Sequence, residues 1–121
     1  MKQYTSNDQT AKLIELGFVP KATIKEVQVV HSRVEVVHDC NFTLGELIEM
    51  LPRCIESGSG SDEAVLEISY DSQDFEWFCG HRMVYNRGWR LFNGDYKTCD
   101  DKELINALYR YVVALKEDGV I

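Results

Sequence analysis

The chain has 121 residues, 45% of them hydrophobic and 27% charged, which is an ordinary composition for one globular domain. No apolar run approaches the roughly 18 residues that span a membrane, and the N-terminal residues contain no apolar signal core, so we expect a cytoplasmic protein. The net charge of −7 disfavours nucleic-acid partners, and we expect the four cysteines to be reduced thiols.

Three short segments have the composition of a helix start, with an oxygen-bearing side chain at the N-cap and Gln or Glu three residues later. In this arrangement each of the two side chains bonds to the other residue's backbone N–H, which the helix leaves unpaired. The pairs are Ser6 with Gln9, Thr43 with Glu46, and Asp100 with Glu103. Each pair precedes an apolar run, so we predict three helices.

The first helix is predicted over residues 7–16, because Gly17 can adopt the left-handed conformation that ends a helix. Residues 22–37 are rich in β-branched side chains and alternate in two stretches, which predicts two strands with a bend near His31 and Ser32. One long bent strand is the alternative, because the bend contains no Gly, Asn or Pro. We expect these strands to lie at an edge of the main sheet or to extend it.

The second helix has the clearest start, with Thr43 as its cap and Phe42 placed to pack onto Leu47. Pro52 cannot donate a backbone hydrogen bond, so the helix should end or kink there. The Gly- and Ser-rich residues 57–62 that follow are interpreted as a flexible loop within the domain, because neither side is long enough to stand alone.

Residues 64–97 predict an antiparallel meander, because short alternating runs are separated by turns too brief for parallel crossovers. Two strand faces are predicted, one with Leu66, Ile68 and Tyr70 and one with Phe75, Trp77 and Cys79. Asn93 followed by Gly94 is the strongest hairpin signal, since both central positions of that turn need positive φ.

The last helix is predicted over residues 101–117, with an apolar stripe about 120° wide and Gly119 as its stop. Tyr109 and Val113 lie outside the stripe, either as scattered exposed residues or as part of an interface. The chain as a whole therefore predicts a single α+β domain over residues 1–121. Its expected order is helix, one or two strands, helix, β-meander, helix, with two or three helices on one face of the sheet.

Several segments predicted to be helical are similar in sequence to those of a known protein family. Residues 5–18, 44–52, 103–109 and 115–121, roughly a third of the chain, resemble a family of small proteins of unknown function from gut bacteria, often associated with phages and mobile elements. The resemblance implies a bacterial, cytoplasmic setting connected with phages or mobile elements. It implies no activity and no site residues.

Two His–Cys pairs are the candidates for a metal site: His38 with Cys40, and Cys79 with His81. Residues two apart on a strand project to the same side, so neighbouring segments could surround a zinc ion. Structural zinc sites usually place two to four residues between ligands, and here there is one. We therefore favour strand residues without a metal, and we expect no cofactor.

A nucleic-acid surface is the second candidate, because aromatic and basic residues interleave over residues 77–97. Its central members are Arg82, Arg87, Trp89 and Arg90. Aromatic residues that alternate along strands are more often core residues, and the chain is acidic, so we rank this alternative second.

The acidic residues are concentrated, with ten between residues 39 and 76 against one basic residue, Arg53. Four carboxylates, Glu67, Asp71, Asp74 and Glu76, form a cluster that could serve acid–base catalysis, although the segment from Asp71 to Asp74 is also typical of a polar turn. We expect no catalysis and predict a protein-interaction module that acts through an acidic face with Glu63, Asp71 and Asp74, or through Tyr109 and Val113. The partner is expected to be a protein, with no membrane involved. The oligomeric state is left open, with a homodimer as one alternative.

Overall fold

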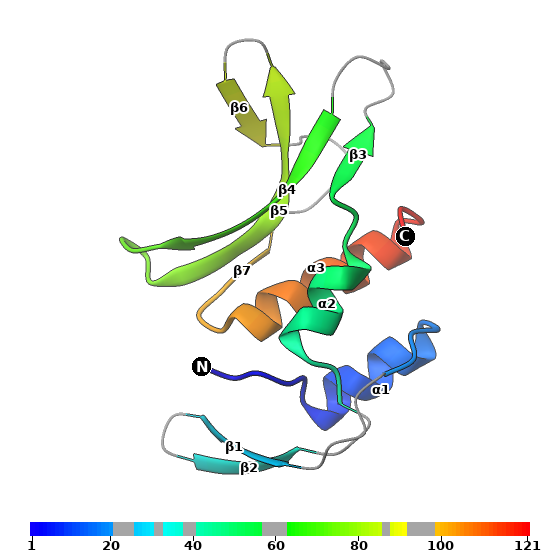
Figure 1. Cartoon of the computed structure of the whole chain (residues 1–121), viewed down its shortest axis with the longest axis vertical. Coiled ribbons are helices and arrows are strands. Elements are labelled where there is room, and N and C mark those ends of the chain that lie inside the picture. The colour runs from blue at the N-terminus through cyan, green and yellow to red at the C-terminus, as the bar shows by residue number, and fades with distance from the viewer. Residues whose placement is uncertain (21–25, 31–32, 38–40, 57–62, 86–87, 92–98) are drawn as a thin grey trace.

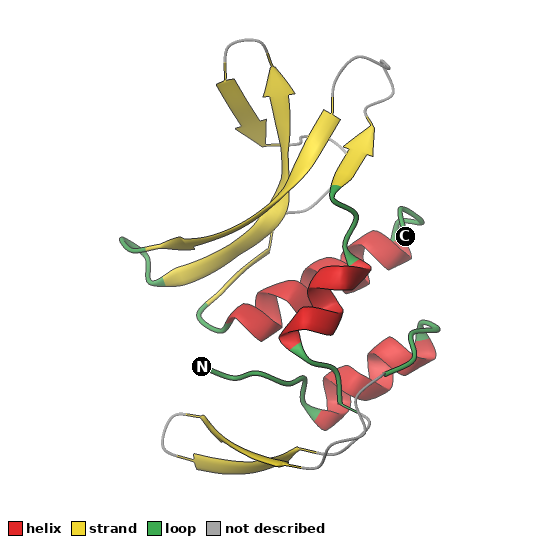
Figure 2. Ribbon diagram, viewed as in Figure 1, coloured by secondary structure: helices red, strands yellow, loops and turns green. Residues whose placement is uncertain are grey.

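The computed structural model describes residues 1–20, 26–30, 33–37, 41–56, 63–85, 88–91 and 99–121. These residues form helices and antiparallel strands in the predicted order, so the fold class is α+β (Figure 1, Figure 2). The main sheet, the pair of helices α2 and α3, helix α1 and a separate hairpin follow one another along the long axis of the molecule.

Helices α1 (Asn7–Glu15) and α2 (Leu44–Met50) begin as predicted. The Ser6 hydroxyl accepts from the backbone N–H of Gln9 at 3.2 Å, and the Gln9 side chain accepts from the backbone of Ser6 at 3.0 Å. Thr43 and Glu46 make the same reciprocal pair at 3.1 and 3.3 Å. Helix α1 ends at Glu15, with Leu16 as its C-cap, and Gly17, which follows with a φ of 100°, is the predicted left-handed stop.

Helix α3 (Leu104–Glu117) begins three residues later than predicted, and its N-cap residue Glu103 makes no side-chain capping bond. The expectation that Asp100 caps this helix is wrong. Asp100 belongs to strand β7 (Cys99–Asp101), where pairing with β5 keeps the backbone extended. The Asp101 carboxylate instead accepts from the backbone N–H of Glu103 at 2.8 Å. The predicted end of the helix is confirmed, with Gly119 at a φ of 77°.

Strands β1 (Glu26–Val30) and β2 (Arg33–Val37) form an antiparallel hairpin, so the two-strand interpretation is confirmed over one long bent strand. The expectation that they join the main sheet or its edge is wrong. They form a sheet of their own, which lies beside α1 at the end of the molecule opposite the main sheet (Figure 1).

The main sheet contains β3 (Cys54–Glu56), β4 (Glu63–Asp71), β5 (Glu76–Tyr85) and β6 (Gly88–Leu91) in that order, and β7 also pairs with β5. The long hairpin of β4 and β5 confirms the predicted meander. The short strands β3 and β7 were not predicted, because three residues carry too little alternation to be detected. The predicted turn at Asn93 and Gly94 and the loop at 57–62 lie outside the described residues.

Phe75 does not share a strand face with Trp77 and Cys79, as had been predicted. It precedes β5, has a φ of 56°, and is 68% exposed. The four-residue turn between β4 and β5 needs a residue in the left-handed region before the next strand begins, and Phe75 occupies this position.

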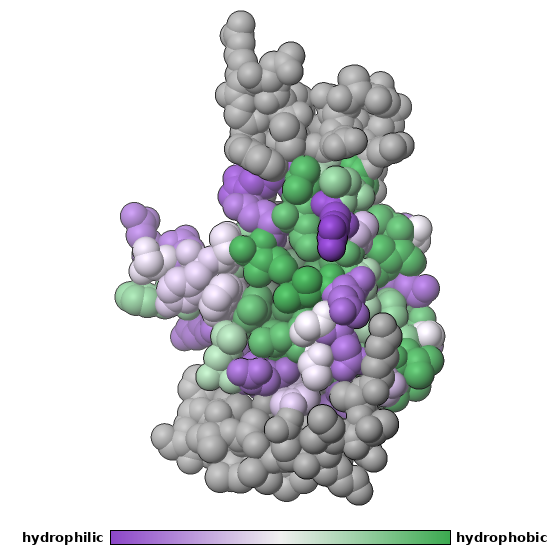
Figure 3. Space-filling view, in the orientation of Figure 1, coloured by the Kyte–Doolittle hydropathy of each residue, from purple (hydrophilic) through white to green (hydrophobic). Residues whose placement is uncertain are grey.

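The hydrophobic core lies where α3 covers β5 and β7 and α2 packs against α3. Its fully buried members include Leu13 of α1, Leu47 of α2, and Leu108 and Tyr111 of α3. Leu66, Ile68 and Trp77 of the sheet pack against this cluster but are only partly buried. Hydrophobic residues therefore gather around the junction of sheet and helices, while the projecting end of the β4–β5 hairpin is mostly hydrophilic (Figure 3).

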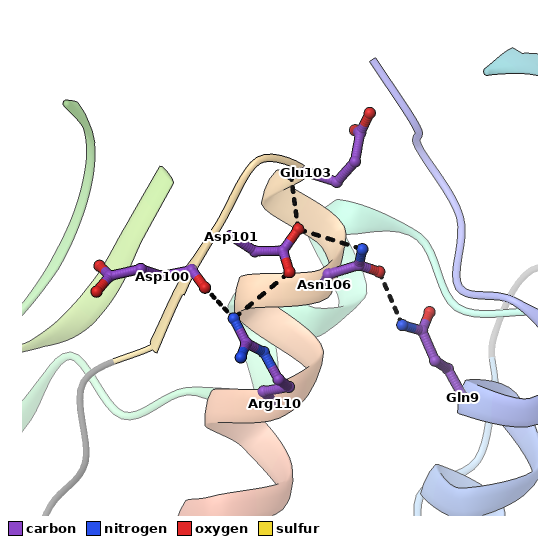
Figure 4. A network of polar contacts seen from close by, with 6 residues as sticks. All are labelled: Gln9, Asp100, Asp101, Glu103, Asn106 and Arg110. Atoms are coloured by element: carbon purple, nitrogen blue, oxygen red, sulfur yellow. Dashed lines mark hydrogen bonds and ion pairs between the residues drawn. The ribbon is translucent and has the colours of Figure 1, made fainter. Parts of the chain in front are cut away.

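A polar network ties β7 and α1 to α3 (Figure 4). Arg110 donates to the backbone carbonyl of Asp100 and lies 3.5 Å from the carboxylate of Asp101. Asn106 donates to Asp101 at 3.3 Å and accepts from the Gln9 side chain at 2.8 Å. The Asp100 carboxylate points away from Arg110, whose contacts in this network are the Asp100 carbonyl and the Asp101 carboxylate.

Candidate functional site

The main sheet has a groove of about 480 Å³ on the face of the β4–β5 hairpin that is turned away from the helices. Strand alternation assigns this face, because Ile68, Trp77 and Cys79 pack against the helix-side core and Ser69 and Phe78 therefore project to the other side. The lining residues come from β4, the following turn, β5 and β7. They are Ser69, Tyr70, Asp71, Ser72, Gln73, Asp74, Glu76, Phe78, Arg82 and Asp100.

Four carboxylates line this groove, which we call the acidic groove: Asp71, Asp74, Glu76 and Asp100. Strand register brings them together, because Asp71 pairs with Glu76 and Asp100 pairs with Phe78. The turn is held by Asp71, whose carboxylate accepts from the backbone N–H of Gln73 at 2.8 Å. The polar-turn interpretation of this segment is therefore confirmed.

Among the described residues that line the groove, Arg82 carries the positive charge, and that charge is already engaged. Its guanidinium donates to the carboxylate of Glu67 in an ion pair. The same guanidinium lies 5.6 Å from the ring centroid of Phe78. The Glu67 carboxylate therefore offsets Arg82, and the four lining carboxylates leave the groove electronegative.

The groove brings together part of the predicted acidic face. Asp71 and Asp74 lie in it, whereas Glu63 begins β4 at the other end of the strand, where its backbone pairs with Glu56 and Val84. Glu76, which the sequence places in the carboxylate cluster but not in the predicted acidic face, also lines the groove, and so does Asp100, which the sequence predicts as a helix cap. No local signal indicates that Asp100 pairs with Phe78 of a strand more than twenty residues earlier.

Tyr109 and Val113, the alternative interaction residues, lie on α3. Both are partly buried and pack against the core cluster. Burial raises the pKa of the Tyr109 hydroxyl, and nearby charges, beginning with Lys12, modify this effect. These two residues therefore contribute to packing as well as to the surface.

A buried histidine lies on the opposite face of β5. His81 is 1% exposed, its Nδ1 is hydrogen-bonded to the hydroxyl of Tyr111, and its Nε2 lies 2.8 Å from the carbonyl oxygen of Pro52. Because a carbonyl can only accept, Nε2 carries the hydrogen, and Nδ1 of the neutral ring accepts from Tyr111. Burial lowers the pKa of His81, although its bond to Pro52 opposes this effect. His81 thus joins β5, α3 and the segment after α2.

Of the four candidate zinc ligands, the structure describes Cys79 and His81. His81 uses both ring nitrogens in hydrogen bonds, and burial, followed by the charge of Cys99, raises the pKa of Cys79 to about 12. His38 and Cys40 lie outside the described residues. Within the part of the chain that the structure describes, no three His, Cys, Asp or Glu side chains are grouped so as to hold a metal ion.

The nucleic-acid candidates are only partly placed. Arg82 is paired with Glu67 on the groove face, and Arg87 lies outside the described residues. Trp89 and Arg90 belong to β6, where they pair with Val84 and Met83 of β5.

The chain matches none of the protein-family models, curated proteins or solved structures with which it was compared. Among the helices in the described ranges, none has the length and apolar character needed to cross a membrane.

Proposed function

We propose that this protein is a non-catalytic interaction module that binds a cationic segment of a partner protein in the acidic groove. One observation carries the proposal. Four carboxylates line a single groove, and the guanidinium of Arg82, which also lines it, is already paired with Glu67, a residue outside the groove lining. A negative potential concentrated in a concave site attracts Lys and Arg side chains and repels phosphate groups.

The magnitudes indicate a salt-sensitive interaction of moderate affinity. Each exposed ion pair contributes about 0.2–1 kcal/mol, so the carboxylates alone give limited affinity. Phe78 adds an aromatic surface on which a Lys or Arg side chain can lie, and one cation–π contact is worth about 0.5–1 kcal/mol. We therefore expect the charges to set specificity and association rate and the Phe78 ring to slow dissociation.

The biological setting rests on the resemblance of the helical segments. It supports a bacterial, cytoplasmic accessory or modulator protein of a phage or mobile element. The groove is compatible with such a role, because accessory proteins act by docking onto other macromolecules.

The proposal is tested with a fluorescent Lys/Arg-rich peptide as probe, measured by anisotropy at low and at high salt. The double variant Asp74→Lys/Glu76→Lys reverses two groove charges and leaves the Asp71 turn intact. The matched control, Glu15→Lys/Asp118→Lys, changes the net charge equally at exposed sites near the ends of α1 and α3.

We expect the groove variant to bind the probe at least about tenfold more weakly and the control to bind within about twofold of the wild type, since only the groove charges face the bound segment. Equal loss in both variants would show a non-specific charge effect and would overturn the proposal. Tighter binding of a single-stranded oligonucleotide than of the peptide would favour the nucleic-acid alternative instead.

A further inference from the structure

Cys79 and Cys99 stand directly opposite each other where β7 pairs with β5. Both are thiols in this structure. Cys79 is fully buried, and Cys99 is half-buried and packs against the same core cluster. The two side chains therefore share the helix-facing side of the sheet, beneath α3.

This placement suits a disulfide. Residues directly opposite in an antiparallel pair have Cα atoms about 4.5–5.5 Å apart and side chains on the same face. A disulfide accommodates Cα separations of about 4.4–6.8 Å, a range that includes both kinds of antiparallel pair. Proximity is also evident electrostatically, because the Cys99 charge contributes, after burial, to the raised pKa of Cys79.

We propose that Cys79 and Cys99 form a reversible dithiol–disulfide couple that is oxidised by a small-molecule disulfide of the glutathione type. The Cys99 thiolate attacks one sulfur of the oxidant and releases one small thiolate. The Cys79 thiolate then attacks the Cys99 sulfur of the mixed disulfide and releases the second. Two protein thiols become one disulfide while the oxidant is reduced to two small thiols, and the two thiol protons pass to those leaving groups or to solvent.

The burial of the two residues sets the order of these steps. Cys99 is the more exposed and reacts first, whereas Cys79 must lose its proton inside the core before it can attack. Because thiolate is the nucleophile, the high pKa of Cys79 makes ring closure the slow step. The mixed disulfide at Cys99 therefore accumulates at neutral pH and closes faster as the pH rises.

The bond would fix one wall of the acidic groove. β7 has three residues, and Asp100, the neighbour of Cys99, pairs with Phe78 and lines the groove. Short strands open more easily than long ones, and a covalent link between β7 and β5 prevents that opening. The redox couple stands whether or not the groove binds a cationic partner.

The test uses the folded full-length protein and oxidised glutathione as the probe. Tryptic cleavage after Arg53 and Arg82 leaves Cys54 and Cys79 in one peptide, and Cys99 falls in a separate short peptide ending at Lys102. The variant Cys54→Ser therefore makes a link between these two peptides unambiguous. Cys54 is exposed on β3, so its replacement should leave the fold intact, which circular dichroism checks.

We expect mass spectrometry to find a glutathione adduct on Cys99 first and then an intramolecular link between Cys79 and Cys99, formed at least about tenfold faster at pH 9 than at pH 7 because more Cys79 is ionised. Cys79→Ala should leave the Cys99 adduct without closure. A predominant link to Cys40 or Cys54, a link between chains, or an adduct that stays open at alkaline pH would overturn the proposal. Formation of the same link at the same rate in urea-unfolded protein would also overturn the proposal, since the native strand register would then not be what brings Cys79 and Cys99 together.

Discussion

Strand β5 has two faces of different chemistry, and its successive residues alternate between them. Cys79 and His81 face the helices, where they are buried and tied into the core. Glu76 and Phe78 face the acidic groove, where charged and aromatic groups meet solvent. The Cys–His pair that resembles a metal motif in the sequence is thus a packing element, and the segment that resembles an ordinary turn builds the groove.

The largest effect is expected on the helix-facing side of β5. His81→Ala removes two hydrogen bonds and leaves the Pro52 carbonyl and the Tyr111 hydroxyl facing a cavity. We expect a loss of about 3 kcal/mol in the free energy of unfolding, measured with urea. The groove-side control, Ser69→Ala, should stay within about 0.5 kcal/mol. Equal losses in both variants would remove the distinction between the two faces.

A smaller loss is expected when one bond of this cluster is removed without a cavity. Tyr111→Phe keeps the ring but deletes the hydroxyl that bonds to Nδ1 of His81. An unfolding titration should show a decrease of about 1–3 kcal/mol, because Nδ1 stays buried without this donor. If stability were unchanged, the hydrogen bond between Tyr111 and His81 would contribute nothing measurable to the fold.

The same cluster predicts an acid sensitivity. Burial lowers the pKa of His81 below its ordinary 6.5, because the folded state favours the neutral imidazole. The contribution of His81 to the free energy of unfolding is therefore fully present above pH 6.5 and is lost as the pH falls below that value. The titratable groups beside it are Tyr111, through the hydrogen bond, and Cys79, two residues along the same face. Unfolding free energies measured between pH 7 and 5 should fall more steeply for the wild type than for His81→Ala. Parallel curves would contradict the buried neutral imidazole.

A substitution in the turn beside the groove is expected to increase stability instead of lowering it. Phe75 holds a left-handed backbone that costs an ordinary residue about 1–2 kcal/mol, and glycine adopts it freely. We expect Phe75→Gly to raise the melting temperature, with a gain of up to about 1 kcal/mol after the entropy of glycine is included. Gln73→Gly, at an exposed position in the same turn, should lose about 0.5–1 kcal/mol. A loss in both variants would mean that the Phe75 ring stabilises the turn.

The smallest stability effect is expected on the groove side of β5. Glu76→Gln should change the free energy of unfolding by less than about 0.5 kcal/mol, because the carboxylate is partly exposed. The same change should weaken capture of the cationic peptide, which separates binding from folding. A large loss of stability would show that Glu76 belongs to the fold rather than to the site.

Local signals explain which elements could be predicted. The reciprocal pairs at Ser6 and Thr43 act within one helical turn, so both starts were located to the residue. The same pattern at Asp100 predicts a helix start that the structure does not have, because pairing of β7 with β5 keeps the backbone of Asp100 extended.

The candidate sites depend on contacts between distant residues. His81 meets partners 29 and 30 residues away, and Asp100 enters the groove through its register with Phe78. Asp71 and Asp74 could be predicted because they share one turn with Gln73. No sequence pattern reveals which carboxylates from separate strands will line one groove, since that depends on strand register.

A titration of ¹⁵N-labelled protein with the Lys/Arg-rich peptide, followed by NMR, shows directly whether a cationic partner segment binds in the acidic groove. We expect the amide signals of residues 71–76, Phe78 and Asp100 to shift in a saturable manner that high salt suppresses. Shifts concentrated at Tyr109 and Val113 on α3, or at Trp89 and Arg90 on β6, would contradict the proposal.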